Sequence, residues 1–63
     1  MVKRLVVERH LRAHGCERVR EGARHSIWEN PTTGRRSSLP RHREIPRHTA
    51  NAICRQLGVP NVS

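Results

Sequence analysis

The sequence predicts an α+β fold in which a helix, three antiparallel strands and a second helix follow one another along the chain. Two observations carry this prediction. Apolar residues recur at helical spacing near both ends, and a turn containing Pro and Gly divides two short runs in the middle. A chain of 63 residues is long enough for one domain with a small core. We therefore expect residues 1–63 to form a single domain whose stability is supplemented by a partner or by self-association.

The first helix is predicted over residues 2–14. This stretch contains no Gly or Pro, and Gly15 follows it, where helices commonly end in a left-handed residue. Val7 and Leu11 are four residues apart, so they lie on one face of the helix. We expect that face to be buried.

Three short strands are predicted in the central region. Their ranges are residues 16–21, 25–29 and 35–39. Pro31 fits the second position of a type I turn and Gly34 supplies a positive φ, so the second and third strands should form a hairpin. Gly22 marks a turn or bulge before the second strand. Pro40 ends the third, because proline has no N–H to donate to a neighbouring strand.

The second helix is predicted over residues 49–57, after a polar connector of residues 41–47. Its apolar residues follow the spacing i, i+3, i+4, i+7, and they are Ala50, Ile53, Cys54 and Leu57. Pro46 suits the entry to a helix, and Gly58 followed by Pro60 ends it.

The excess of positive charge predicts a polyanionic partner. Thirteen Lys and Arg side chains against five acidic ones give a formal net charge of +8, and all of these cations except Lys3 are arginines. The planar guanidinium matches phosphate oxygens better than an ammonium group does. The alternative is a solvated basic surface that keeps a small protein soluble. Solubility alone does not select Arg over Lys, so we favour the polyanion.

The cysteines and histidines predict neither a disulfide nor a metal centre. The N-terminal stretch lacks the pattern of a signal peptide, so we expect a reducing, cytoplasmic setting in which Cys16 and Cys54 are small buried side chains. The spacing of possible ligands fits no standard zinc motif. These residues are Cys16, His25, His42, His48 and Cys54. We interpret His10 and His14 as flanking residues of the first helix. No run approaches the roughly 20 apolar residues that span a bilayer, so no membrane association is expected.

Five stretches, in this order, resemble a known family. They are LRAHG (residues 11–15), RHSIW (24–28), NPTTGR (30–35), LPRH (39–42) and the helical residues 49–58. Together they make the chain similar to HicA-type toxins, the small ribonucleases of bacterial HicA/HicB type II toxin–antitoxin pairs. The resemblance implies a double-stranded-RNA-binding-like fold with both helices on one face of the sheet. It also implies cleavage of messenger RNA without a metal or other cofactor, and neutralisation by a HicB-like antitoxin in a complex that can be of higher order.

By this resemblance, His25 falls on the catalytic histidine of the family. RNA carries its own nucleophile, the 2′-hydroxyl, so a histidine that removes its proton and arginines that stabilise the phosphorane can cleave it. Arg24 is the predicted stabilising residue at the cut. The residues predicted to bind the RNA backbone farther away are Arg35, Arg36, Arg41, Arg43 and Arg47. His42 is a second candidate, as general acid or phosphate ligand, with a solvated loop residue as the alternative.

The period of two along the second strand places His25 and Ile27 on one face and Trp28 on the other. If Ile27 faces the helices, His25 lies at the rim of the interface between helices and sheet, where a phosphate can still reach it. We expect Trp28 to pack in the core. The alternative is that it stacks on an RNA base.

Two alternatives to a ribonuclease are a non-catalytic RNA-binding module, which recognises shape and phosphates, and an inactive HicA-like remnant. The second alternative rests on Arg24, which stands where the family commonly has a small residue, and on Cys16, which replaces a large aromatic residue.

Overall fold

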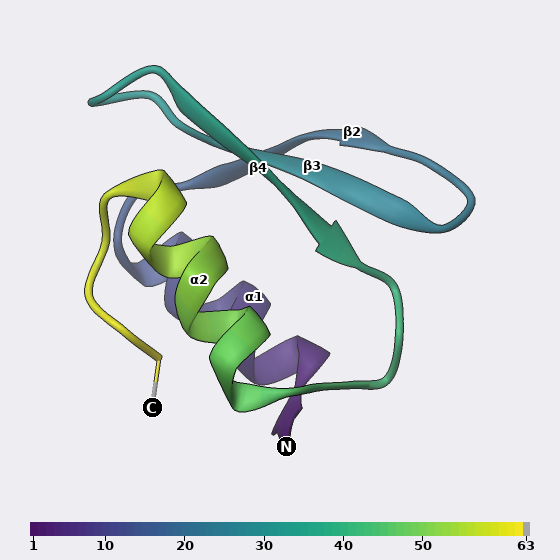
Figure 1. The fold of residues 1–63 in the computed structure, drawn as a ribbon. Helices are drawn as coiled ribbons and strands as arrows, with labels where there is room; N and C mark the ends of the chain where they lie inside the picture. The colour runs from purple at the N-terminus through teal and green to yellow at the C-terminus, as the bar shows by residue number, and fades with distance from the viewer. Residues whose placement is uncertain (63) are drawn as a thin grey trace.

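The predicted order of one helix, three strands and a second helix is confirmed by the computed structural model, which describes residues 1–62. The elements are β1 (Val2–Lys3), α1 (Arg4–Ala13), β2 (Glu17–Glu21), β3 (His25–Asn30), β4 (Arg35–Pro40), β5 (Glu44–Ile45) and α2 (Arg47–Leu57). The main sheet has the antiparallel order β2-β3-β4. Both helices lie on the same side of this sheet, α2 beside α1 (Figure 1). The result is an α+β fold of two layers.

The helices cover the face of the sheet that carries Trp28. Along β3, Ser26, Trp28 and Asn30 are buried, whereas Ile27 is half-buried and His25 is exposed. The condition under which His25 would lie at the rim of the interface between helices and sheet, with Ile27 facing the helices, is therefore not met. Trp28 is larger than Ile27 and removes more apolar surface from water when buried, so it determines which face is covered. His25 consequently lies on the open face.

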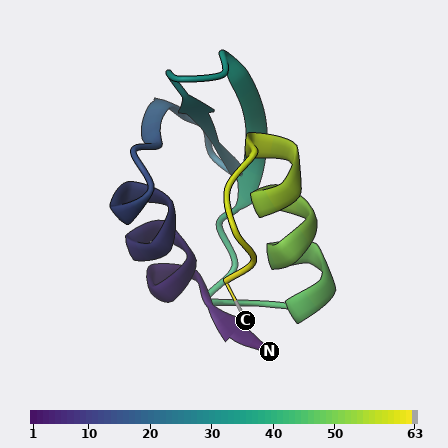
Figure 2. The same ribbon diagram turned by 90° about the vertical axis from the view of Figure 1, so that its left-hand side faces the viewer.

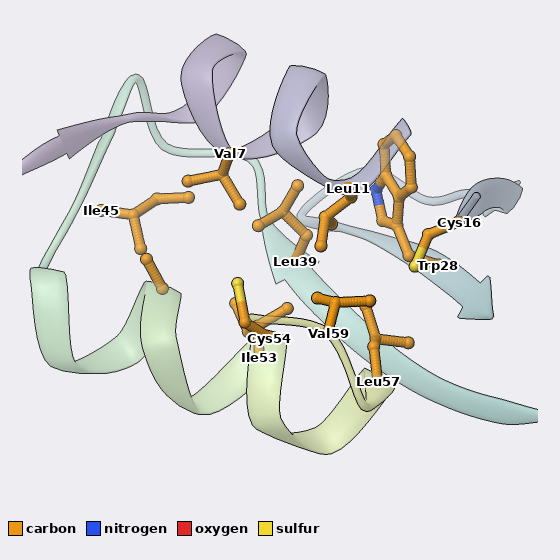
Figure 3. Close-up of a cluster of buried hydrophobic side chains, with 11 residues drawn as sticks. Val7, Leu11, Cys16, Trp28, Leu39, Ile45, Ile53, Cys54, Leu57 and Val59 are labelled. Carbon is orange, nitrogen blue, oxygen red and sulfur yellow. The ribbon is translucent and has the colours of Figure 1, made fainter. Parts of the chain in front are cut away.

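The core lies between the helices and the covered face of the sheet (Figure 3). Trp28 is completely buried there, and its indole Nε1–H donates to Ser26 Oγ at 3.1 Å. The indole is thus a core residue, as we expected, and is unavailable for stacking on a base. Val7 and Leu11 of α1 are fully buried, which confirms the predicted face of that helix. The apolar face of α2 is also buried, with Ala50, Ile53, Cys54 and Leu57 in the core.

A second, two-stranded sheet joins the N-terminus to the connector before α2. Val2 pairs with Ile45 and Lys3 with Glu44. From the sequence, we instead expected the first helix to begin at residue 2 and residues 41–47 to form an irregular connector. Two-residue strands have no periodicity to recognise. They form here because Ile45 is fully buried and Val2 packs against the core beside it.

The C-terminal segment returns between the two helices (Figure 2). Gly58 ends α2 with a φ of +76°, and Val59 packs into the core. The Val62 amide then donates to Asn51 Oδ1 at 3.1 Å. His10 Nε2 lies 2.7 Å from the Pro60 carbonyl oxygen, so His10 donates to this segment from the flank of α1.

Candidate functional site

His25 borders a groove on the surface, at the start of β3. We call this the His25 groove, and its lining residues are Ala23, Arg24, His25, Arg41 and His42. His25 stands opposite Pro40 in the β3–β4 pair, so the residues that directly follow β4 are brought next to it. Two imidazoles and two guanidinium groups, from segments far apart in the sequence, therefore line one open site. All four of these side chains belong to exposed residues.

The loop before His25 depends on glycine. The Gly22 amide donates to the His25 carbonyl oxygen at 2.8 Å, which closes the turn between β2 and β3. A Cβ atom at position 22 would lie only 2.9 Å from that same oxygen. Such a distance is shorter than real Cβ contacts, so only glycine permits this close approach without a shift of the backbone. Gly22 thereby fixes where β3 begins and where His25 stands.

Arg41 also holds this loop in place, through its side chain and its backbone amide. Its Nη1 donates to the Gly22 carbonyl oxygen at 2.9 Å, and its backbone amide donates to the Arg24 carbonyl oxygen at 3.0 Å. Its Nη2 lies 3.3 Å from Glu21 Oε1. The sequence predicted a substrate-binding role for Arg41. In the structure, its guanidinium already binds the protein and positions the loop that carries Arg24 and His25.

Arg35 and Arg36 are far from His25. They pair with Asn30 and Glu29 at the opposite end of the hairpin. At about 3.3 Å per strand residue, the four or five intervening positions correspond to roughly 13 to 17 Å. Arg36 Nε also lies 3.3 Å from Glu29 Oε2. Neither arginine is placed to touch a phosphate that also touches His25.

Two other predicted arginines do not line the His25 groove. Arg43 borders a neighbouring groove together with Lys3, Arg4, Leu5 and Arg41. Arg47 is the exposed first residue of α2. Of the predicted site residues, Arg24, Arg41 and His42 are therefore the ones that the structure places beside His25, although Arg41 was predicted to bind RNA away from the cut.

Arg20 is a residue of this region that was not predicted from the sequence. A shallow hollow on the open face is lined by Arg20, Gly22, Ala23, Arg24, His25 and Ile27. Simple alternation along β2 would put Arg18 and Arg20 on the same face. A bulge between them shifts the register, so that Arg18 pairs with Trp28 and Arg20 with Ile27. No local pattern in the sequence marks this bulge.

Within residues 1–62, no group of three or more His, Cys, Asp or Glu side chains is arranged to hold a metal ion. In the same part of the chain, neither helix combines the length and the apolar character needed to cross a bilayer.

Fold and groove together define a small, strongly basic α+β protein with an accessible histidine among arginines. Comparison with protein families is more specific. The family model described as HicA toxin of bacterial toxin-antitoxin matches residues 6–59, so the chain belongs to the HicA toxin family. No curated protein and no solved structure gave a significant match.

Membership of this family confirms the resemblance found in the sequence. The chain is a toxin of the toxin–antitoxin type, from a family whose members are generally ribonucleases. The family implies an RNA substrate and a cognate antitoxin.

Proposed function

We propose that the chain is an endoribonuclease toxin that cleaves messenger RNA without a metal ion and thereby arrests translation. It would act in the cytoplasm as a single HicA-like domain of residues 1–63, and a HicB-like antitoxin would neutralise it by covering the groove. The observation that carries this proposal is that His25 and His42 line one exposed groove together with Arg24.

Two imidazoles in one groove can share the proton transfers of RNA cleavage. His25, as the neutral base, removes the proton of a ribose 2′-hydroxyl, and the 2′-oxygen attacks the adjacent phosphorus. The bond between phosphorus and the 5′-oxygen breaks, and His42, as imidazolium, donates a proton to that leaving oxygen. The products are a 2′,3′-cyclic phosphate and a 5′-hydroxyl end. A second step is not required for the strand to be cut.

Arg24 supplies positive charge where the phosphorane forms. It is exposed, it lines the groove directly before His25, and the described residues provide its side chain with no acidic partner. Arg41 holds the loop, as its contacts with Gly22 and Glu21 indicate. Arg35, Arg36, Arg43 and Arg47 would contact the RNA backbone away from the cut.

The test is expression of wild type, His25→Ala and His42→Ala in bacterial cells without the antitoxin. His48→Ala is the matched control, because His48 is an exposed histidine of α2 that does not line the groove. We expect growth arrest and loss of intact messenger RNA with wild type and His48→Ala. Loss of a general acid or base typically costs about 10² to 10⁴ in rate, so the two groove variants should be harmless.

Cleavage by purified protein in the presence of EDTA completes the test. Persisting cleavage with 2′,3′-cyclic phosphate ends is the expected result. If wild type binds RNA but does not cut it, the chain is an RNA-binding module or an inactive member of the family, and the proposed reaction is refuted.

A further inference from the structure

A second basic groove adjoins the His25 groove. We call it the Lys3 groove, and its lining residues are Lys3, Arg4, Leu5, Arg41 and Arg43. Four of these five residues are cations, and no acidic residue of the described chain lines it. Arg41 lines both grooves, so the two are neighbours on one surface.

Tertiary structure builds this groove from two distant segments. The pairing of β1 with β5 places Lys3 beside Glu44, and the Arg4 amide donates to the Arg43 carbonyl oxygen at 2.9 Å. Arg4 Nη1 donates to the Arg41 carbonyl oxygen at 2.7 Å. These hydrogen bonds fix the backbone that carries the four cations before any ligand arrives, which limits the backbone entropy lost on binding.

The cations of the groove differ in how far the protein neutralises them. Arg4 Nε lies 3.5 Å from Glu8 Oε2, and Arg41 binds Glu21. Lys3 and Arg43 are exposed, and neither makes an ion pair within residues 1–62. These two side chains are therefore the ones available to an incoming anion.

We propose that the Lys3 groove is a phosphate subsite for the RNA strand that runs from the His25 groove across Arg41. This inference rests on the proposed function, because the RNA is the strand whose cleavage we assign to His25. Lys3 and Arg43 bind a backbone phosphate outside the cut, and Arg4 and Arg41 hold the site in shape. A contiguous path of cations suits an RNA strand, which carries a negative charge at every nucleotide.

The experiment measures binding rather than cleavage, so it is independent of whether the chain cuts RNA. A fluorescent, unstructured oligouridine is titrated with His25→Ala protein, and the change in anisotropy is followed from about 50 to 200 mM salt. The test variant carries Lys3→Ala and Arg43→Ala in addition. The matched control carries Arg9→Ala, which removes one exposed positive charge from α1 outside both grooves.

Each lost phosphate contact should lower the slope of log affinity against log salt by about 0.7, which at 0.1 M salt is about a fivefold loss of affinity. The double variant loses the one phosphate contact that Lys3 and Arg43 share, so it should bind about fivefold more weakly and with a salt slope that is shallower by about 0.7. The Arg9→Ala control should stay close to the parent. Unchanged secondary structure by circular dichroism confirms that the fold is kept.

Two results would overturn the inference. One is a loss of log affinity in the double variant that is only twice the loss in the Arg9→Ala control, because the variant lacks two positive charges and the control lacks one; this would mean that net charge alone acts. The other is unchanged RNA binding in the double variant; weaker binding of the antitoxin to that variant would then assign the Lys3 groove to the protein partner. Failure of wild-type protein to cleave RNA refutes the proposed function and leaves this binding result intact.

Discussion

Substitution of Gly22 by Ala tests whether the turn between β2 and β3 positions His25. The new Cβ would lie 2.9 Å from the His25 carbonyl oxygen, whereas ordinary contact begins at 3.4 Å, so the strand end must retreat by about 0.5 Å. That retreat stretches the 2.8 Å hydrogen bond from the Gly22 amide to the same oxygen. Loss of the bond costs about 1 kcal/mol, which lowers the melting temperature by about 4 to 8 °C in a domain of this size.

Gly22→Ala should slow RNA cleavage by more than its loss of stability alone explains. A misplacement of about 1 Å can cost 10² in rate, so half of that displacement should cost about tenfold. The matched control is Gly34→Ala in the β3–β4 turn. Gly34 has a φ of +74°, and no atom lies within 4 Å of the position that its Cβ would take, so Ala there costs about 1 to 2 kcal/mol in backbone strain. Its turn lies at the end of the hairpin away from His25.

Thermal unfolding and cleavage of a fluorescent RNA, the latter well below both melting temperatures, separate the two effects. We expect similar destabilisation in both variants and slower cleavage in Gly22→Ala alone. If both variants cleave at the wild-type rate while folded, or if both slow equally, the Gly22 contact does not position the histidine and the reasoning is refuted.

Three further predictions concern Arg41, Trp28 and the two cysteines. Arg41→Ala releases the loop and should lower the cleavage rate at saturating RNA by tenfold or more, whereas Arg9→Ala should leave it near wild type; equal rates would show that Arg41 does not position the loop. Trp28→Ala removes a fully buried indole and should cost about 3 to 5 kcal/mol, enough to abolish most of the helical circular dichroism signal of so small a domain; a native spectrum would contradict the assigned core. Burial raises the pKa of the Cys16 thiol, with a further contribution from the charge of Cys54, and burial likewise raises the pKa of Cys54. Alkylation of both thiols should therefore be slow until denaturant is added. The contribution of the two buried thiols to the free energy of unfolding should be complete below the ordinary pKa of a thiol. It should fall as the pH rises above that value, because the thiols of the unfolded chain ionise first.

The helices and the hairpin were predictable because their signals are local. The spacing of Ala50, Ile53, Cys54 and Leu57 indicates one apolar face, and the structure buries all four residues. Asn30 to Gly34 carries its own turn chemistry, with the Gly34 amide donating to the Asn30 carbonyl oxygen at 2.8 Å. Each of these features depends on residues within a few positions of one another.

The arrangement of the candidate site was not predictable in the same way. Alternation along β3 separates His25 and Ile27 from Trp28, but it does not show which side the helices cover. The burial of Trp28 decided that question and left His25 on the open face. The sequence likewise indicated arginine as a phosphate ligand without showing that Arg41 is held by Gly22 and Glu21.

By itself, the sequence determined the charge of this toxin, its order of helices and strands, its hairpin and its family, because composition and short-range periodicity are properties of neighbouring residues. Only the tertiary structure decided that His42 joins His25, that Lys3 joins Arg43, and that Arg35 and Arg36 lie at the other end of the sheet. These juxtapositions depend on strand register and on the competition between side chains for a small core, which no single stretch of the chain encodes.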